Sequence, residues 1–73
     1  MAKLMNVETG EVFAAGNNIN EIMEELNEDD GDWSYYYRSD SSMVDAYFCE
    51  TEESGKFDYD GENADTIYDV IED

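Results

Sequence analysis

Apolar and polar residues alternate near the start of the chain, on either side of a short polar turn. Residues 4–15 show this alternation, with Met5 and Phe13 among the apolar positions of the two arms. The turn reads Glu-Thr-Gly-Glu over residues 8–11, and its Gly10 can adopt the positive φ that tight hairpin turns require. This pattern predicts a β-hairpin.

The period of the pattern changes after Asn18. Apolar residues then recur at positions i, i+3, i+4 and i+7, which places them on one face of a helix: Ile19, Ile22, Met23 and Leu26. Asn18 suits the N-cap position, and the acid Glu21 three positions later strengthens the signal for a helix start. We therefore predict an amphipathic helix over about residues 19–28, which ends in an acidic loop around Gly31.

Three further segments have the features of strands. Residues 33–38 are rich in aromatic side chains, which favour strands. Residues 43–51 alternate between two faces, with Val44, Ala46 and Phe48 on one and Asp45, Tyr47 and Cys49 on the other. This second segment is expected to bury one side only, and a short helix over it is the alternative. Residues 56–60 alternate again, so the three segments together predict an antiparallel meander.

The last apolar repeat has helical spacing. After Asn63, which suits an N-cap, positions i, i+3, i+4 and i+7 are again apolar: Ala64, Ile67, Tyr68 and Ile71. We predict a second amphipathic helix there. The element order is then ββαβββα, and residues 1–73 form a small single α+β domain with an antiparallel β-sheet and two amphipathic helices packed on it.

Net charge narrows the classes of function. The 73 residues include 21 Asp and Glu but only 3 Lys and Arg, which gives a formal net charge of −18. Proteins that bind nucleic acid or anionic membranes need clustered Lys and Arg, so we expect no direct nucleic-acid binding and no membrane binding. No apolar run approaches the roughly 18 residues of a membrane span, and the single Cys49 cannot form an intramolecular disulfide. These features predict a cytoplasmic protein.

Catalytic and metal-binding chemistry find little support in the sequence. A chain of this length has little core in which to build a deep pocket, and without any His the thiol of Cys49 lacks its usual activating base. We therefore expect no enzymatic activity. Placing Gly31 or Gly61 at the sixth position of a calcium loop puts apolar, aromatic or basic residues where oxygen ligands are required. One Cys and no His also argue against zinc, so no metal and no cofactor are predicted.

The placement of the acids is the most informative feature of the sequence. Glu21, Glu24, Glu25 and Glu28 stand opposite the apolar stripe of the first predicted helix, and further acids stand opposite that of the second. Like charges one turn apart destabilise a helix by a few tenths of a kcal/mol per pair, and Lys at some of these positions would remove that cost. We therefore predict a partner-binding surface made of these acids and of those in the loop after the first helix: Glu21, Glu24, Glu25, Glu28, Asp29, Asp30, Asp32, Asp65, Asp69 and Glu72.

Such a surface has the physical character of a polyanion. Helix carboxylates one turn apart are separated by about 5 to 6 Å, a scale similar to that of phosphates along a DNA strand, whose axial rise is about 3.4 Å per nucleotide. In size, net charge, acidic helix faces and interleaved aromatic residues, the chain resembles the small acidic DNA-mimic inhibitors of bacteriophages, a group that includes anti-restriction proteins, anti-CRISPR proteins and uracil-DNA glycosylase inhibitors. These inhibitors share no common fold or residue signature. The resemblance implies a protein that occupies the basic DNA-binding groove of a target in the host cytoplasm and excludes DNA from it.

Two other interpretations use the same residues differently. An acidic regulatory module would bind its partner through an aromatic hot spot, with the acids steering the encounter: Trp33, Tyr35, Tyr36 and Tyr37. In the second, the charge is a generic solvated or halophile-like surface. We expect at least two of Trp33, Tyr35 and Tyr37 to lie in the core, and we take Tyr36 and Tyr47 as candidate aromatic anchors.

Overall fold

The computed structural model describes residues 1–29, 32–48 and 61–72. Within these residues the chain forms five strands and one helix: β1 (Ala2–Asn6), β2 (Val12–Gly16), α1 (Ile19–Asp29), β3 (Trp33–Arg38), β4 (Met43–Phe48) and β5 (Thr66–Glu72). The predicted α+β class is confirmed, as are the hairpin, the first helix and the strand over residues 33–38.

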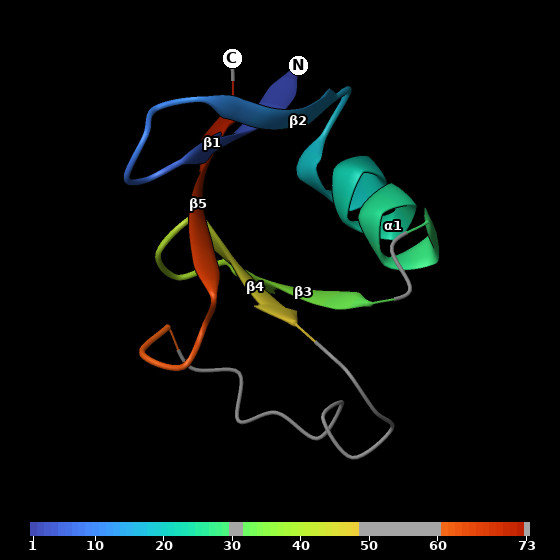
Figure 1. Ribbon diagram of the computed structural model, residues 1–73. Helices are drawn as coiled ribbons and strands as arrows, with labels where there is room; N and C mark the ends of the chain where they lie inside the picture. The colour runs from blue at the N-terminus through green and yellow to red at the C-terminus, as the bar shows by residue number, and fades with distance from the viewer. Residues whose placement is uncertain (30–31, 49–60, 73) are drawn as a thin grey trace.

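All five strands belong to one antiparallel sheet with the order β2-β1-β5-β4-β3. The last strand of the chain, β5, therefore lies in the centre of the sheet, between β1 and β4. The sheet is strongly curved, and α1 lies on its concave side, where it contacts β1, β2 and β3 (Figure 1). Because of this curvature, a single helix reaches strands at both edges of the sheet.

The β1–β2 hairpin depends on Asn6 and Gly10. The Oδ1 of Asn6 accepts hydrogen bonds from the backbone N–H groups of Glu8 at 2.8 Å and Thr9 at 3.1 Å. Gly10 has a φ of 77°, a conformation that side chains with a Cβ rarely adopt. The side chain of Asn6 thus organises the turn that the sequence pattern predicted.

A bulge in β2 places an aromatic ring on the concave side of the sheet. The register between β1 and β2 shifts after Leu4, so that β2 contains one extra residue. At this bulge the ring of Phe13 stacks on Tyr68 of β5, with the two ring centroids 4.4 Å apart. The bulge therefore directs Phe13 towards the same side of the sheet as α1.

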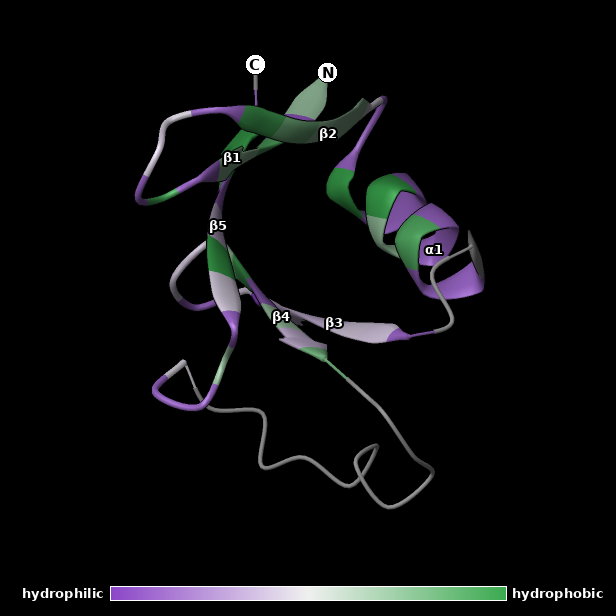
Figure 2. Cartoon of the chain, viewed as in Figure 1, coloured by the Kyte–Doolittle hydropathy of each residue, from purple (hydrophilic) through white to green (hydrophobic). Residues whose placement is uncertain are grey.

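The helix begins and packs as the sequence predicted. The Oδ1 of Asn18 accepts a hydrogen bond from the backbone N–H of Glu21 at 2.9 Å, which satisfies one of the unpaired donors at the helix start. All four apolar positions of the predicted stripe face the core, and Ile22 is only 2% exposed. Figure 2 shows the apolar side of α1 turned towards the sheet and its polar side turned away.

Asn27 attaches the last turns of α1 to the edge strand β3. Its Oδ1 accepts a hydrogen bond from the backbone N–H of Tyr35 at 3.1 Å, and its Nδ2 donates to the carbonyl oxygens of Met23 at 3.0 Å and Tyr35 at 3.5 Å. The side-chain amide thereby takes the place of a peptide group in a neighbouring strand, and it covers part of the outer edge of β3. The helix is held by hydrogen bonds as well as by its apolar face.

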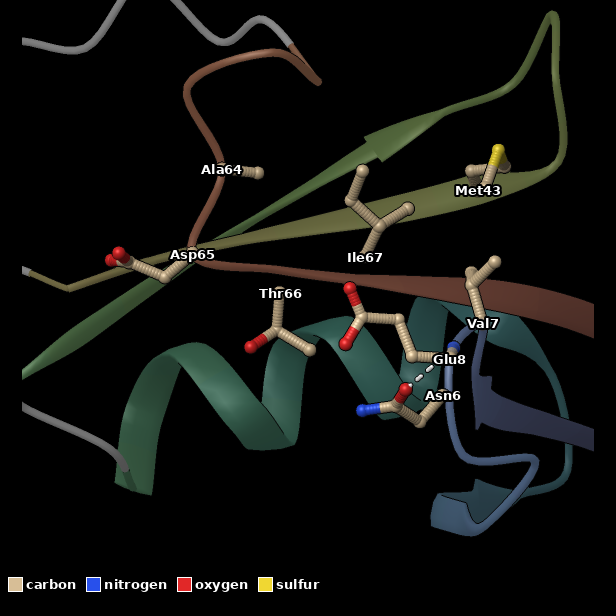
Figure 3. Close-up of a pocket in the computed structure, with 8 residues that line it drawn as sticks. All are labelled: Asn6, Val7, Glu8, Met43, Ala64, Asp65, Thr66 and Ile67. Atoms are coloured by element: carbon tan, nitrogen blue, oxygen red, sulfur yellow. Dashed lines mark hydrogen bonds between the residues drawn. The ribbon is translucent and has the colours of Figure 1, made fainter.

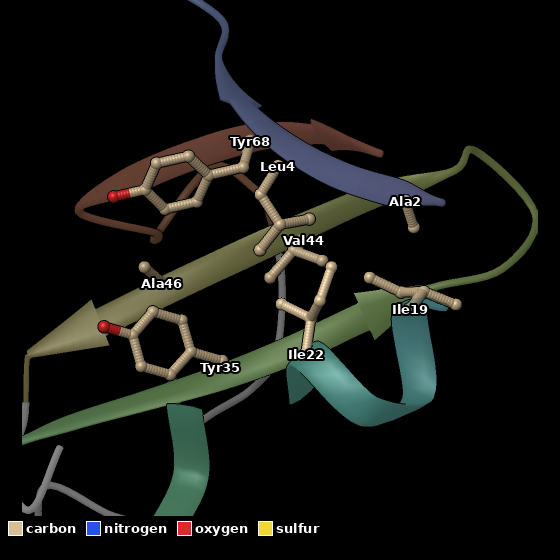
Figure 4. Packing of buried hydrophobic residues seen from close by; sticks show 8 residues of the cluster. All are labelled: Ala2, Leu4, Ile19, Ile22, Tyr35, Val44, Ala46 and Tyr68. Carbon is tan, nitrogen blue, oxygen red and sulfur yellow. The ribbon is translucent and has the colours of Figure 1, made fainter. Parts of the chain in front are cut away.

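The hydrophobic core fills the space between α1 and the concave side of the sheet. Figure 4 shows its buried members, which come from α1 and four strands: Ala2, Leu4, Ile19, Ile22, Tyr35, Val44, Ala46 and Tyr68. Leu4 and Val44 have no exposed surface. Burial of one such aliphatic side chain contributes about 1.5 to 3 kcal/mol, so this small cluster supplies much of the driving force for folding.

The second predicted helix is wrong, because residues 66–72 form the central strand β5. This segment is rich in β-branched residues, whose side chains favour strands: Thr66, Ile67, Val70 and Ile71. β5 pairs with β1 on one side and β4 on the other, with Val70 opposite Leu4 and Tyr68 opposite Val44. The apolar spacing of the segment fits a helix, but in the strand these residues fall on both faces.

The predicted one-sided burial of β4 is also wrong, as is the alternative of a short helix. Asp45 and Tyr47 were expected on the exposed face, yet each is 1% exposed, whereas Phe48 is 42% exposed. The physical reason is that the second face of β4 is covered too: Arg38 pairs with Asp45 there, and Gly61 approaches the Oδ1 of Asp45. Residues 49–51 and the predicted strand over 56–60 lie outside the described residues. The described element order is ββαβββ, with one helix, in place of the predicted ββαβββα.

Candidate functional site

The outward side of α1 carries four glutamates, which we call the α1 acidic face: Glu21, Glu24, Glu25 and Glu28. All four are exposed, and together they line a shallow, open depression of about 240 Å³. The prediction that they share one face of a helix is confirmed. Because the opposite face of α1 is packed on the sheet, these carboxylates point into solvent as one array.

No cation of the described residues neutralises the α1 acidic face. Arg38 forms an ion pair within the sheet, and the last turn of α1 contains no basic residue. Lys3 alternates with a buried neighbour in β1, so its side chain points to the convex side of the sheet, away from α1. The C-terminal end of a helix also carries partial negative charge, which adds to the repulsion at Glu25 and Glu28.

The acids predicted on a second helix do not form a stripe. Asp65 precedes β5, and its Oδ2 accepts a hydrogen bond from the backbone N–H of Phe48 at 2.7 Å. Asp69 is half-buried within β5, and Glu72 is exposed at the end of that strand. Residues three positions apart in a strand point to opposite faces, so Asp69 and Glu72 do not share a surface. The predicted stripe fails because it assumed helical spacing.

The remaining acids of the predicted surface lie at the C-terminal end of α1. Asp29 is the last residue of the helix, and Asp30 lies outside the described residues. Asp32 is exposed immediately before β3. Among the described residues, the structure therefore brings the four glutamates together and places Asp32 in the connection that follows them.

Of the two candidate aromatic anchors, Tyr36 is on the surface and Tyr47 is not. Tyr36 is 42% exposed, and the guanidinium carbon of Arg38 lies 6.0 Å from the centroid of its ring. Tyr47 is buried, so the prediction that it anchors a partner is wrong. The expectation that at least two of the three cluster residues lie in the core is met in part: Tyr35 is buried in the core, whereas Trp33 and Tyr37 are half-buried and pack against it.

A buried ion pair lies on the convex side of the sheet, and sequence reasoning missed it. The Nε of Arg38 donates a hydrogen bond to the Oδ2 of Asp45, which is buried, whereas the side chain of Arg38 is 29% exposed. The hydrogen bond to Asp45 raises the pKa of Arg38 against the lowering effect of burial, so the guanidinium stays charged. Arg38 pairs with Met43 across the β3–β4 hairpin, which makes it a diagonal neighbour of Asp45. The signal in the sequence was a lone Arg close to an Asp within an otherwise apolar strand.

A pocket with a volume of about 240 Å³ lies where the β1–β2 turn meets the start of β5. Figure 3 shows the residues that line it: Asn6, Val7, Glu8, Met43, Ala64, Asp65, Thr66 and Ile67. The backbone N–H of Val7 donates to the carbonyl oxygen of Ile67 at 3.2 Å, which ties the two walls together. Sequence reasoning did not find this pocket, because its walls come from segments that are distant along the chain.

In the described part of the chain, no group of three or more Cys, Asp or Glu side chains is placed to hold a metal ion. The helix described here is neither long enough nor apolar enough to cross a membrane. Comparisons with protein-family models, curated proteins and solved structures gave no match. The function is therefore inferred from the geometry and charge of the chain itself.

Proposed function

We propose that this protein is a nonenzymatic DNA mimic that occupies the basic nucleic-acid-binding groove of a target protein and blocks the binding of DNA. The observation that carries the proposal is the α1 acidic face, whose four exposed glutamates have no neutralising cation among the described residues. A basic groove supplies the missing cations, and charge of opposite sign also speeds the encounter of the two proteins.

The geometry of α1 supports this role. Carboxylates one turn apart on a helix are separated by about 5 to 6 Å, which approaches the spacing of phosphates along a DNA strand. The helix that carries the array is fixed before binding, because Ile22 anchors the inner face of α1 and Asn27 is hydrogen-bonded to β3. A preformed helix loses less conformational entropy when a partner binds than one that folds on binding.

The energetic cost of the α1 acidic face also supports a role in binding. Each like-charge pair one turn apart destabilises the helix by about 0.2 to 0.5 kcal/mol, and acids near the helix C-terminus add repulsion with the helix dipole. None of the described contacts offsets this cost with an opposite charge. We propose that the partner does so. Nucleases of host defence, CRISPR effectors and other DNA-binding proteins present grooves of the required charge.

The test uses two matched triple variants. The helix triple combines Glu24→Gln, Glu25→Gln and Glu28→Gln, whereas the control triple combines exposed acids outside α1: Glu11→Gln, Asp40→Asn and Glu72→Gln. Each set removes three negative charges. Glu21 is retained because its carboxylate accepts a hydrogen bond from Asn17 at 3.3 Å at the start of the helix.

Immobilised wild-type protein should capture basic proteins from a bacterial lysate at low salt, and added duplex DNA should release them. The control triple should capture the same proteins, and the helix triple should capture them about tenfold more weakly, since it lacks three carboxylates of the proposed contact surface. If both triples lost the same amount of captured protein, binding would depend only on the net charge and not on the α1 acidic face. Captured proteins that DNA does not release would contradict mimicry.

A further inference from the structure

We infer that the pocket between the β1–β2 turn and the start of β5 binds one Lys or Arg side chain of a partner protein. The pocket shares no residue with the α1 acidic face. The inference rests on the proposed function, since it requires a basic partner, but it adds a second contact with a different chemistry. On α1 the partner meets carboxylates alone, whereas here it meets carboxylates beside an apolar wall.

The size of the pocket selects a single side chain as its occupant. Its volume is about 240 Å³. Pockets for small-molecule ligands usually span about 300 to 1,000 Å³, so this one is too small for most of them. An extended side chain that enters from a partner surface needs less room, because its backbone stays outside.

The residues that line the pocket suit a side chain with a cationic group at the end of an alkyl stem. One part of the wall is apolar, with Val7, Met43 and Ile67, and the other carries the carboxylate of Glu8 and the hydroxyl of Thr66. Figure 3 shows the Glu8 carboxylate beside Thr66 and Ile67, with Met43 and Val7 towards one end of the pocket. Lys and Arg side chains pack their stems along apolar surface and keep their charged heads at polar groups.

Some hydrogen-bond acceptors of the pocket have no partner among the described contacts. One oxygen of Asp65 accepts the backbone N–H of Phe48, and the Oδ1 of Asn6 is occupied within its own turn. No ion pair of the described residues involves the carboxylate of Glu8. This carboxylate is therefore available to a cation, and the repulsion of 18 excess negative charges disfavours an anionic occupant.

The two walls of the pocket hold a fixed relative position. Glu8 follows Asn6, whose Oδ1 accepts the backbone N–H of Glu8 at 2.8 Å. The backbone hydrogen bond from Val7 to Ile67 then ties this turn to β5, which carries Thr66. The backbone that carries Glu8 and the apolar wall are therefore in place before any ligand arrives, which favours binding of even one side chain.

The test titrates n-butylguanidinium, which carries the head and stem of an Arg side chain, into isotopically labelled full-length protein. We expect saturable changes in the backbone N–H signals of the pocket residues: Val7, Glu8, Thr66 and Ile67. Guanidinium without the alkyl stem should bind more weakly, because it cannot use the apolar wall. The variant Val7→Ser should reduce the affinity for n-butylguanidinium towards that for guanidinium, while its remaining amide signals show that the fold persists.

Glu8→Gln and Glu11→Gln provide a matched pair of variants. Both residues are exposed in the same hairpin turn and both changes remove one negative charge, but only Glu8 lines the pocket. Glu8→Gln should weaken binding of n-butylguanidinium about three- to fivefold, the range of an exposed ion pair, and Glu11→Gln should leave it nearly unchanged.

Equal effects of the two variants would overturn the inference, as would signal changes that do not saturate or that are strongest on α1. The helix triple keeps the pocket and should bind n-butylguanidinium as the wild type does. A helix triple that competes with DNA as well as the wild type does would therefore refute the proposed function, and it would leave the inference about the pocket unaffected. A pocket without saturable binding would refute only the further inference.

Discussion

The acids of α1 and the acids of the sheet differ in what they contact. On α1 the glutamates point into solvent with no neutralising cation among the described residues. On the sheet, Asp45 is buried against Arg38, and Asp65 accepts a backbone hydrogen bond from Phe48. In the sequence these carboxylates all count as equal negative charges. In the structure, Asp45 and Asp65 have partners within the sheet, so we expect them to stabilise the fold. We expect the mutual repulsion of the α1 acidic face to destabilise it, because no described cation offsets that repulsion.

The largest effect is expected for Asp45→Asn. Asn at this position, where Asp45 is 1% exposed, cannot form the ion pair with Arg38 and replaces a charge-assisted hydrogen bond by a buried amide, so the melting temperature should fall by on the order of 10 °C. Thermal unfolding followed by circular dichroism measures the change. The control is Asp40→Asn, the same chemical change at an exposed residue of the β3–β4 turn. If both variants melted alike, the buried pair would not stabilise the fold.

The helix triple should change stability in the opposite direction. Loss of the like-charge pairs on α1 and of two acids near the helix C-terminus should raise the free energy of unfolding by about 1 kcal/mol. Gln has nearly the helix propensity of Glu, so the helix itself is preserved. Denaturant unfolding of the wild type and of both triples measures the gain. A loss of stability in the helix triple would show that these glutamates make stabilising contacts after all.

Asp65→Asn should have a smaller effect than Asp45→Asn. The Asn side chain can still accept the backbone N–H of Phe48, but this bond loses its charge assistance, so we expect a loss of about 0.5 to 1 kcal/mol. Denaturant unfolding gives the difference from the wild type. An increase in stability would mean that Asp65 destabilises the fold, as we expect of the α1 glutamates.

The smallest effect is expected in how the melting temperature of the helix triple responds to salt. NaCl screens self-repulsion over a Debye length of about 10 Å at 0.1 M, so the melting temperature of the wild type should rise as salt is added. The helix triple should gain about 1 to 2 °C less than the wild type over the same range, because part of the repulsion is already removed. Melting curves recorded at several NaCl concentrations test this. Identical salt responses would mean that the α1 acidic face contributes little to the repulsion.

Local signals in the sequence were sufficient for the elements whose partners are close along the chain. The Glu-Thr-Gly-Glu turn gave the hairpin, and the apolar stripe after Asn18 gave α1 and its acidic face. The final segment was predicted wrongly, because Ile67, Tyr68 and Ile71 satisfy a helical period and a buried strand equally well. What decides between them is pairing with β1, whose residues lie 62 to 70 positions earlier in the chain, and local periodicity carries no information about this pairing.

The candidate sites show the same limit. The α1 acidic face was predicted in full, because four residues within two turns of one helix define it. The burial of Asp45 and its ion pair with Arg38 were missed, because alternation along β4 puts Asp45 on the other face of the strand from Val44, which implied that it is exposed to solvent. The pocket of Figure 3 was missed for a similar reason, because it forms only when the β1–β2 turn is brought against the start of β5.

The central claim is that the α1 acidic face takes the place of DNA on a basic partner, and a competition measurement tests it most directly. A captured partner is purified and bound to labelled duplex DNA, and the wild type, the helix triple and the control triple are titrated against the complex at several salt concentrations. The account predicts that the wild type and the control triple displace DNA at similar concentrations. The helix triple should need about tenfold more protein and show a shallower salt dependence, because fewer basic groups of the partner are neutralised. Displacement by the helix triple at the same concentration and with the same salt dependence as the control triple would contradict the claim.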